Sequence, residues 1–199
     1  MSDDPTRVQE FFGARAAGWD SRFPDDGPAY AAAVRDLGLR SGDAVLDAGC
    51  GTGRALPALR EAVGPTGTVL GVDLTPEMLD AAVRAGRDGA AALLLADVAR
   101  LPVRDGTLDA VFGAGLVSHL ADPAGGLREL ARVVSPGGRL ALFHPLGRAA
   151  LAARHGRRVT GDDLRAEHNL GPVLGGSGWR MVSYTDRADR YLAIAVRAD

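Results

Sequence analysis

The chain has 199 residues, of which 46% are hydrophobic and 24% are charged, values typical of one globular domain with a full core. The formal net charge is -2 and all 23 basic residues are arginine, so no overall field favours nucleic acid or a membrane surface. No apolar run reaches 18 residues, and the N-terminal MSDDPTRVQE is polar and acidic. We therefore expect a soluble, cytoplasmic protein without nucleic-acid or membrane partners.

Apolar segments alternate with helical ones along the first three quarters of the chain, which predicts a parallel sheet covered on both faces. Thr75-Pro76 predicts a helix start capped by the threonine hydroxyl, and Ser135-Pro136-Gly137-Gly138 predicts a helix stop followed by a tight turn. The expected helices cover residues 4–17, 28–38, 55–63, the segment after Thr75, and 122–134; the expected strands cover 44–47, 67–73, 91–96, 107–113 and 139–143.

After His144 the pattern loosens into helical pieces around 146–156 and 161–177. Two further segments, 179–184 and 190–197, are joined by a short turn and predict a hairpin, hence an antiparallel strand late in the sheet. The expected fold is α/β, a Rossmann-like, doubly wound, mostly parallel seven-stranded sheet with helices on both faces. We expect one domain over 1–199, with an N-terminal helical lid (1–40), a cofactor-binding core (42–144), a variable substrate-side segment (145–178) and a C-terminal hairpin (179–197).

The stretch from Val45 to Gly53, VLDAGCGTG, places a hydrophobic strand and an acid before three alternating glycines. Glycines in such a loop let the backbone approach a ligand closely. The carboxylate of Asp47 would repel a pyrophosphate, but it suits an ammonium or sulfonium group. The dinucleotide pattern G-x-G-x-x-G also fails here. The loop therefore favours S-adenosylmethionine over a dinucleotide.

Four segments, VLDAGCGTG, VLGVDLTPEML, LLADVARLPVRDGTLDAVF and VVSPGGRLALF, resemble the successive motifs of class I S-adenosylmethionine-dependent methyltransferases. The resemblance runs from about Gly42 to Phe143, is strongest to the small-molecule branch that includes quinone-biosynthesis enzymes, and extends to the C-terminal hairpin. It implies S-adenosylmethionine as cofactor and methyl transfer to O, N or C of a small-molecule acceptor.

The same resemblance implies a cofactor site at the ends of the first four strands. Asp73 matches the acid that accepts both ribose hydroxyls, and Asp97 matches the acid that faces the adenine amine. Met78 fits either a ring contact or plain core. The cofactor positions implied are Asp47, Gly49, Cys50, Gly51, Gly53, Asp73, Leu74, Met78, Asp97, Val98, Gly113, Ala114 and His119.

Candidates for the acceptor side are fewer. His144 ends the fifth expected strand and is the first choice for a general base, although a structural histidine beside Pro145 is equally compatible. His119 is the second candidate. The basic run 154–158 would suit an acidic substrate, but a solvated helix end is the favoured interpretation.

In the N-terminal part, Trp19-Asp20 matches an aromatic–acid pair that the family carries in a lid over the cofactor. Trp19, Arg22 and Tyr30 are therefore candidates for the substrate and lid side, with core packing as the alternative for Trp19.

The single cysteine, Cys50, is interpreted as a small filler rather than a reactive thiolate, and no metal site is expected. Two other functions stay open at this point. One is a non-catalytic module that binds S-adenosylmethionine and regulates a partner, and the other is a nicotinamide-dependent oxidoreductase. The oligomeric state is expected to be a monomer or a homodimer.

Overall fold

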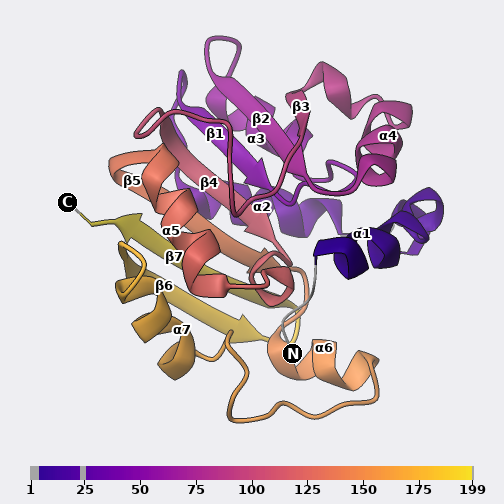
Figure 1. Cartoon of the computed structure of the whole chain (residues 1–199), viewed down its shortest axis with the longest axis vertical. Coiled ribbons are helices and arrows are strands. Elements are labelled where there is room, and N and C mark those ends of the chain that lie inside the picture. The colour runs from indigo at the N-terminus through magenta and orange to yellow at the C-terminus, as the bar shows by residue number, and fades with distance from the viewer. Residues whose placement is uncertain (1–4, 23–25, 199) are drawn as a thin grey trace.

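A seven-stranded sheet forms the centre of the protein in the computed structural model, which describes residues 5–22 and 26–198 (Figure 1). Its strand order is β3-β2-β1-β4-β5-β7-β6, with β1 to β5 parallel and β7 antiparallel to both of its neighbours. This confirms the predicted fold class. The strands are β1 Ala44–Ala48, β2 Thr68–Asp73, β3 Ala92–Leu95, β4 Leu108–Ala114, β5 Val134–His144, β6 Trp179–Arg187 and β7 Arg190–Arg197.

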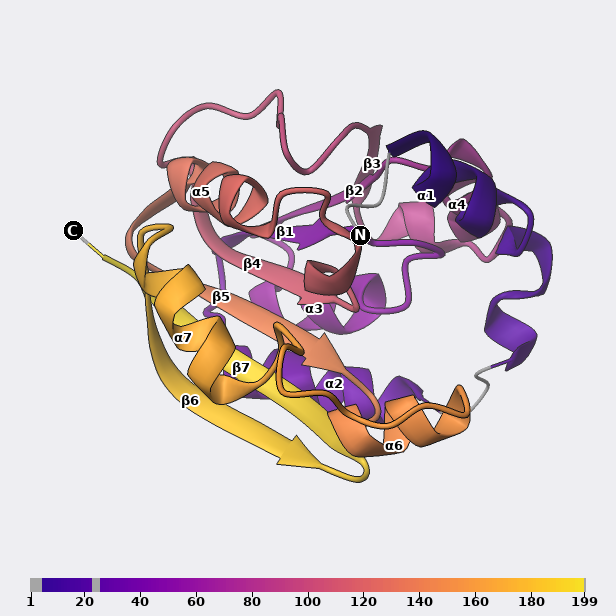
Figure 2. The same ribbon diagram turned by 60° about the horizontal axis from the view of Figure 1, so that its bottom comes forward.

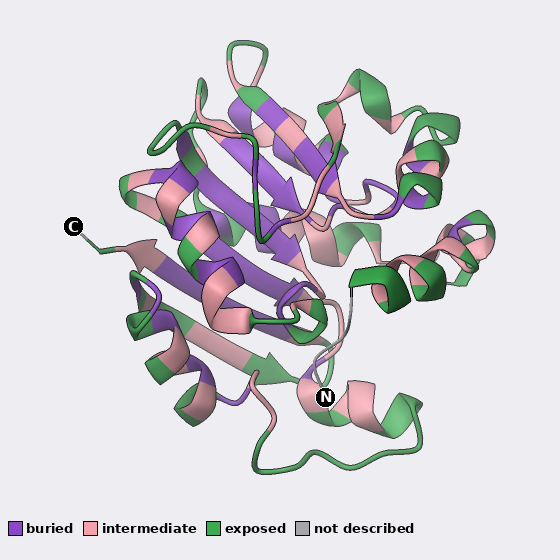
Figure 3. Ribbon diagram, viewed as in Figure 1, coloured by how far each residue is buried: buried purple, intermediate pink, exposed green. Residues whose placement is uncertain are grey.

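Helices cover both faces of this sheet. Successive strand residues point to opposite sides, and both sides carry apolar side chains that must be buried. Val45 joins a core cluster with α2 and α3, whereas its neighbour Leu46 joins a second cluster with α5 and α7. The burial colours of Figure 3 follow this arrangement, with the central strands buried. The helices are α1 Pro5–Gly13, α2 Gly27–Leu37, α3 Leu56–Val63, α4 Pro76–Arg84, α5 Pro123–Val133, α6 Arg148–Arg154 and α7 Glu167–Gly175.

Three local predictions differ from the structure. α5 stops where expected, but the segment after it continues directly as β5, with Val134 paired to Leu108 and an irregular register before Ala110. Gly137 in this segment has a φ of 76°, so the expected tight turn is present as an irregularity inside β5. Thr75 does precede α4, yet its side chain makes no capping bond; its N–H donates to Asp73 instead. The α1 helix is shorter than the expected segment 4–17.

β1 lies between β2 and β4, so the order of the strands reverses at this point. In open α/β sheets such a reversal leaves a crevice at the carboxyl ends of the strands, where ligands bind. α1 and α6 lie at that edge, and the long connection between α6 and α7 passes along it (Figure 2). The fold therefore positions a binding site between the strand tips and the two segments that precede β1 and follow β5.

Within the described residues, no helix has both the length and the apolar character needed to cross a membrane.

Candidate functional site

A cavity of about 730 Å³ opens at the carboxyl edge of the sheet. It is lined by the N-terminal segment, the glycine loop, the tips of β1 to β5 and the segment that contains α6. The site residues predicted from the sequence that line it are Trp19, Tyr30, Asp47, Gly49, Cys50, Gly51, Asp73, Leu74, Met78, Asp97, Val98, Gly113, Ala114, His119 and His144.

Two predicted residues are absent from this lining. Gly53 has a φ of 79° and lies behind the loop, where an added Cβ would come within 2.8 Å of the Leu56 side chain. Its role in the structure is therefore close packing of the loop onto α3. Arg22 is exposed on a short 3-10 helix, Asp20–Arg22, and does not contribute to the cavity wall.

The glycine loop is bound to the tip of β2. The Gly51 N–H donates to Asp73 Oδ2 at 2.7 Å, and the Thr75 N–H donates to Asp73 Oδ1 at 2.8 Å. A carboxylate oxygen accepts more than one hydrogen bond, so both oxygens can still accept from a bound ribose. Burial raises the pKa of Asp73 above its ordinary value, while the bonds from Thr75 and Gly51 oppose that shift. Asp73 thus fixes the loop and presents acceptors to the cavity.

Asp47 is the most unusual group of the site. It is 2% exposed, and its Oδ2 has no hydrogen-bond partner among the described residues. Burial, followed by the nearby charge of Asp73, raises its pKa from 3.8 to about 8. A buried carboxylate oxygen without a partner costs free energy, and a cation in the cavity would remove that cost. The residues present therefore fit a ligand with an ammonium or sulfonium group.

The opposite side of the glycine loop carries apolar and acidic groups that suit a flat ring. Met78 is 1% exposed and still reaches the cavity wall beside Leu74 and Val98. Asp97 lies just after β3, and its Oδ1 accepts a hydrogen bond from the Ala99 N–H at 2.8 Å. This bond stabilises a local turn there.

The N-terminal segment is held over the glycine loop by polar contacts. Asp20 accepts from the Thr52 hydroxyl at 2.6 Å and from Arg87 at 2.6 Å, and Arg87 also donates to the Thr52 carbonyl. Gln9 donates to the Leu74 carbonyl at 2.8 Å. The pair Trp19-Asp20 stands out in the sequence, but these partners do not, because they come from separate elements.

Aromatic rings close the same side of the cavity. Phe12 makes edge-on contacts with Trp19 at 5.5 Å and with His119 at 5.0 Å between ring centroids. Tyr30 packs against Phe143 at 5.1 Å and lies 5.4 Å below the Arg54 guanidinium. Trp19 and Tyr30 therefore combine packing with a place in the cavity wall.

His144 ends β5 and is half-buried. Its Nδ1 lies 2.9 Å from the Leu146 carbonyl oxygen and 3.0 Å from the Leu146 nitrogen. In the tautomer that carries hydrogen on Nδ1, this N–H donates to the carbonyl and Nε2 is left as an acceptor. Burial lowers the pKa of His144 below its ordinary value, with smaller contributions from the charges of Arg165 and Arg154. A neutral imidazole able to take up a proton is the result.

Cys50 is buried, and burial strongly raises the pKa of its thiol. This environment disfavours a thiolate nucleophile. Within residues 5–22 and 26–198, no group of His, Cys, Asp and Glu side chains is arranged to hold a metal ion.

Tyr191 and Arg165 are among the cavity-wall residues that the sequence pattern does not identify. Tyr191 lies on β7 directly opposite His144 on β5, and Arg165 precedes α7. Tyr191 belongs to an apolar strand pattern that predicts only a hairpin. Its position beside His144 depends on β7 lying next to β5, which the sequence alone does not specify.

Residues 46–142 match the family model described as a methyltransferase domain. The chain is 39% identical over 111 residues to the demethylmenaquinone methyltransferase of Staphylococcus aureus, with 53% of this chain and 44% of that protein covered. It is 41% identical over 110 residues to an uncharacterized 37.1 kDa protein in transposon TN4556 of Streptomyces fradiae, with 55% and 32% covered. The chain thus spans less than half the length of both relatives.

Solved structures share the fold over nearly the whole chain. Magnesium protoporphyrin IX methyltransferase from Synechocystis PCC 6803 with bound SAH superimposes with a TM-score of 0.72 at 20% identity, covering 98% of this chain and 100% of the other. A methyltransferase from Aquifex aeolicus gives 0.70 at 24% identity, covering 98% and 99%. Residues 46–142 of this chain thus match a methyltransferase domain, and the whole chain shares the fold of solved methyltransferases.

Proposed function

We propose that this protein transfers the methyl group of S-adenosylmethionine to O, N or C of a small-molecule acceptor by in-line displacement. The observation that carries the proposal is the buried, unpartnered Oδ2 of Asp47, which lies in the same cavity as His144. The first suits a cation, and the second is a neutral base at the far side. The similarity to a demethylmenaquinone methyltransferase supports a small acceptor.

When bound, S-adenosylmethionine supplies a methyl group already activated by its positive sulfur. Asp47 would face the positive charge, Asp73 would accept from the ribose, and the backbone of Gly49 and Gly51 would approach the methionine portion. The segment held by Asp20 excludes water from this half of the cavity. The protein's main contribution is thus to hold donor and acceptor in line.

His144 has a role only for some acceptors. A phenol or alcohol must lose its proton, and Nε2 of His144 can accept it, an effect worth about 10²–10⁴-fold in rate. An amine acceptor needs only its neutral lone pair. We further propose that the protein works in the cytoplasm as a monomer or homodimer.

Two measurements on the purified protein test this function. Isothermal titration is expected to show binding of S-adenosylmethionine and of its demethylated product but not of NADH. A radiolabelled-methyl screen over phenols, amines and carbon acids is expected to give a labelled small molecule. Binding without transfer to any acceptor class would instead favour a non-catalytic module, and micromolar NADH affinity would favour an oxidoreductase.

A further inference from the structure

The two ends of the cavity differ in charge. The donor end carries Asp47, Asp73 and Asp97 at the tips of β1 to β3. The far end is built by the chain after β5 and is rich in arginine. Its charged lining residues are Arg154, Arg157, Arg158, Asp162, Asp163 and Arg165.

The acids of this far end do not neutralise it. Asp163 is bound by Arg165 at 3.1 Å and lies 3.6 Å from Arg148, and Arg148 also pairs with Asp186 at 2.9 Å. These two arginines and two acids form a balanced network. Arg157 and Arg158 then outnumber the one exposed acid beside them in the lining, Asp162, which leaves a positive rim.

Tyr191 supplies an unsatisfied polar group at the base of this end. The residue is 2% exposed, yet its hydroxyl has no hydrogen-bond partner among the described residues. The ring is held by an edge-on contact with Tyr184 at 5.8 Å and by its position opposite His144. A buried hydroxyl without a partner costs free energy, so its persistence in a cavity wall indicates a ligand atom that accepts from it.

Arg165, which lines the same cavity, offers a second donor. Its Nε and Nη2 donate to the two oxygens of Asp163, each at 3.1 Å, and no residue of the described chain accepts from its Nη1. The Tyr184 hydroxyl fixes the Arg165 backbone by donating to its carbonyl at 2.9 Å. The Arg165 charge acts on both neighbouring rings, since it lowers the pKa of His144 and opposes the burial that raises the pKa of Tyr191.

We propose that the acceptor is an oxyanion-bearing small molecule, whose carboxylate or phosphate is bound by Arg165 Nη1 and the Tyr191 hydroxyl beneath the rim formed by Arg154 and Arg157. Arginine and phenol donors in the wall of one cavity are suited to an oxyanion. An anion here also interacts favourably with a positively charged donor at the other end. The proposal rests on the proposed function and specifies its substrate class.

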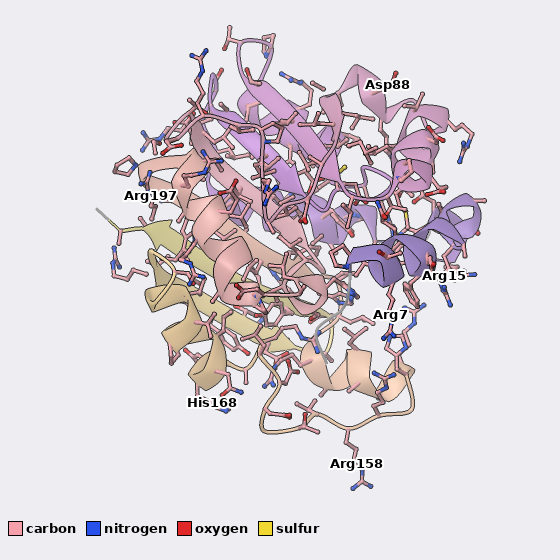
Figure 4. The ribbon with its side chains drawn as sticks, viewed as in Figure 1. Arg7, Arg15, Asp88, Arg158, His168 and Arg197 are labelled. Atoms are coloured by element: carbon pink, nitrogen blue, oxygen red, sulfur yellow. The ribbon has the colours of Figure 1, made fainter. Side chains whose placement is uncertain are left out.

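Arg158 has a weaker part in this site. Figure 4 shows its side chain extending away from the body of the protein, from the connection between α6 and α7. It adds to the positive field over the rim but is not one of the groups that hold the ligand.

The test measures binding to the protein loaded with S-adenosylhomocysteine, without any turnover. The probes are hydroxy- and aminobenzoates and short hydroxy- and aminoalkanoates, their phosphate monoester analogues, and the neutral amide of each acid. We expect at least one anion to bind tenfold or more tightly than its amide. Comparing carboxylates with phosphates identifies which oxyanion the site takes.

Variants locate the binding groups. Arg165→Gln and Tyr191→Phe are each expected to weaken binding of the preferred anion about tenfold and to weaken binding of the amide much less. The double variant Arg154→Gln/Arg157→Gln is expected to weaken binding of the preferred anion about threefold, and this difference from the wild type should disappear at high salt. The matched control is Arg84→Gln/Arg128→Gln, which removes the same charge at exposed positions outside the cavity and is expected to have no effect.

Anions that bind no more tightly than their amides, or that bind the Arg165 and Tyr191 variants as well as the wild type, would overturn the proposal. A lower melting temperature of Tyr191→Phe would do the same, because it would reveal a structural partner for the hydroxyl. Selective anion binding without methyl transfer would refute only the proposed function. Equal transfer to acids and amides would refute only this inference.

Discussion

The donor end and the acceptor end of the cavity are held together in different ways. At the donor end, Asp73 binds the backbone of Gly51 and Thr75, so its geometry depends on main-chain atoms close to the glycine loop. At the acceptor end, Tyr191 and Arg165 are positioned by β7, Tyr184 and Asp163, whose side chains must all be in place. A donor site built on backbone can be encoded in short motifs, whereas an acceptor site built on side chains is free to vary.

The largest effect is expected at the donor end from Asp73→Ala. It removes the acceptor for the ribose and two bonds that hold the loop, and one charge-assisted bond is worth about 1.5–3 kcal/mol. We expect the Kd of S-adenosylmethionine to rise at least about tenfold by isothermal titration.

A matched control for that variant is Asp109→Ala. Asp109 also accepts a backbone bond, from the Ala44 N–H at 2.8 Å, but at the opposite end of β1. It is expected to lower stability without changing Kd. An unchanged Kd in Asp73→Ala would mean that the ribose lies elsewhere, and the donor end would lose its motif-based explanation.

Asp47→Asn is expected to abolish a pH dependence. The folded protein keeps a proton on Asp47 up to a pKa of about 8, whereas the unfolded chain loses it near 3.8, so this group lowers the free energy of unfolding as pH rises between those values. A cation that requires the ionised form releases that proton on binding. The affinity for S-adenosylmethionine should therefore rise by up to about tenfold per pH unit below 8 and level off above.

The asparagine variant has no proton to release at this position. We expect it to bind the donor more weakly at pH 8 and to lose the slope, with equal or greater stability there. Titrations and urea unfolding from pH 6 to 9 measure both effects. A wild-type slope in the variant would show that Asp47 does not face the charge of the donor.

Asp20→Ala tests whether the N-terminal segment belongs to the donor end. The substitution removes the acceptor shared by Thr52 and Arg87, and because Asp20 is partly exposed the effect should be moderate. We expect an approximately threefold higher Kd for the donor and faster dissociation in stopped-flow measurements. Ser21→Ala, which loses only a local bond to the Gly18 carbonyl, is the control. Equal dissociation rates in the two variants would exclude a lid role.

Sequence reasoning succeeded where the pattern is local. The strand that leads to Asp47, the acid that ends β2 and the C-terminal hairpin all follow from short runs of residues, and they fix the sheet and most of the donor end. The segment from Ser135 to Gly138 differs only in where the strand begins. Proline and glycine predict a turn there, and Gly137 has a φ of 76°, but β5 already pairs with β4 at Val134, before that turn.

Most residues of the acceptor end could not be predicted from the sequence, for a physical reason. The run 154–158 has the pattern of a solvated helix end, and its residues are indeed exposed, yet all of them except Gly156 also line the cavity. Arg22 shows the opposite error, since its proximity to Trp19 in sequence does not bring it to the site. Which exposed residue faces a cavity depends on how the connection after α6 crosses the strand tips, and no short-range pattern encodes that path.

The smallest expected effect is a difference in stability between phenylalanine variants of the two hairpin tyrosines, Tyr184 and Tyr191. Tyr184→Phe loses the hydrogen bond to the Arg165 carbonyl, and we expect a loss of about 0.5–1.5 kcal/mol in the free energy of unfolding by urea denaturation. Tyr191→Phe removes a hydroxyl with no partner and is expected to be neutral or stabilising. The same change on neighbouring strands thus has opposite consequences, because only one hydroxyl is satisfied within the fold. If both variants lost equal stability, the Tyr191 hydroxyl would be structural, and the acceptor end would no longer differ from ordinary core.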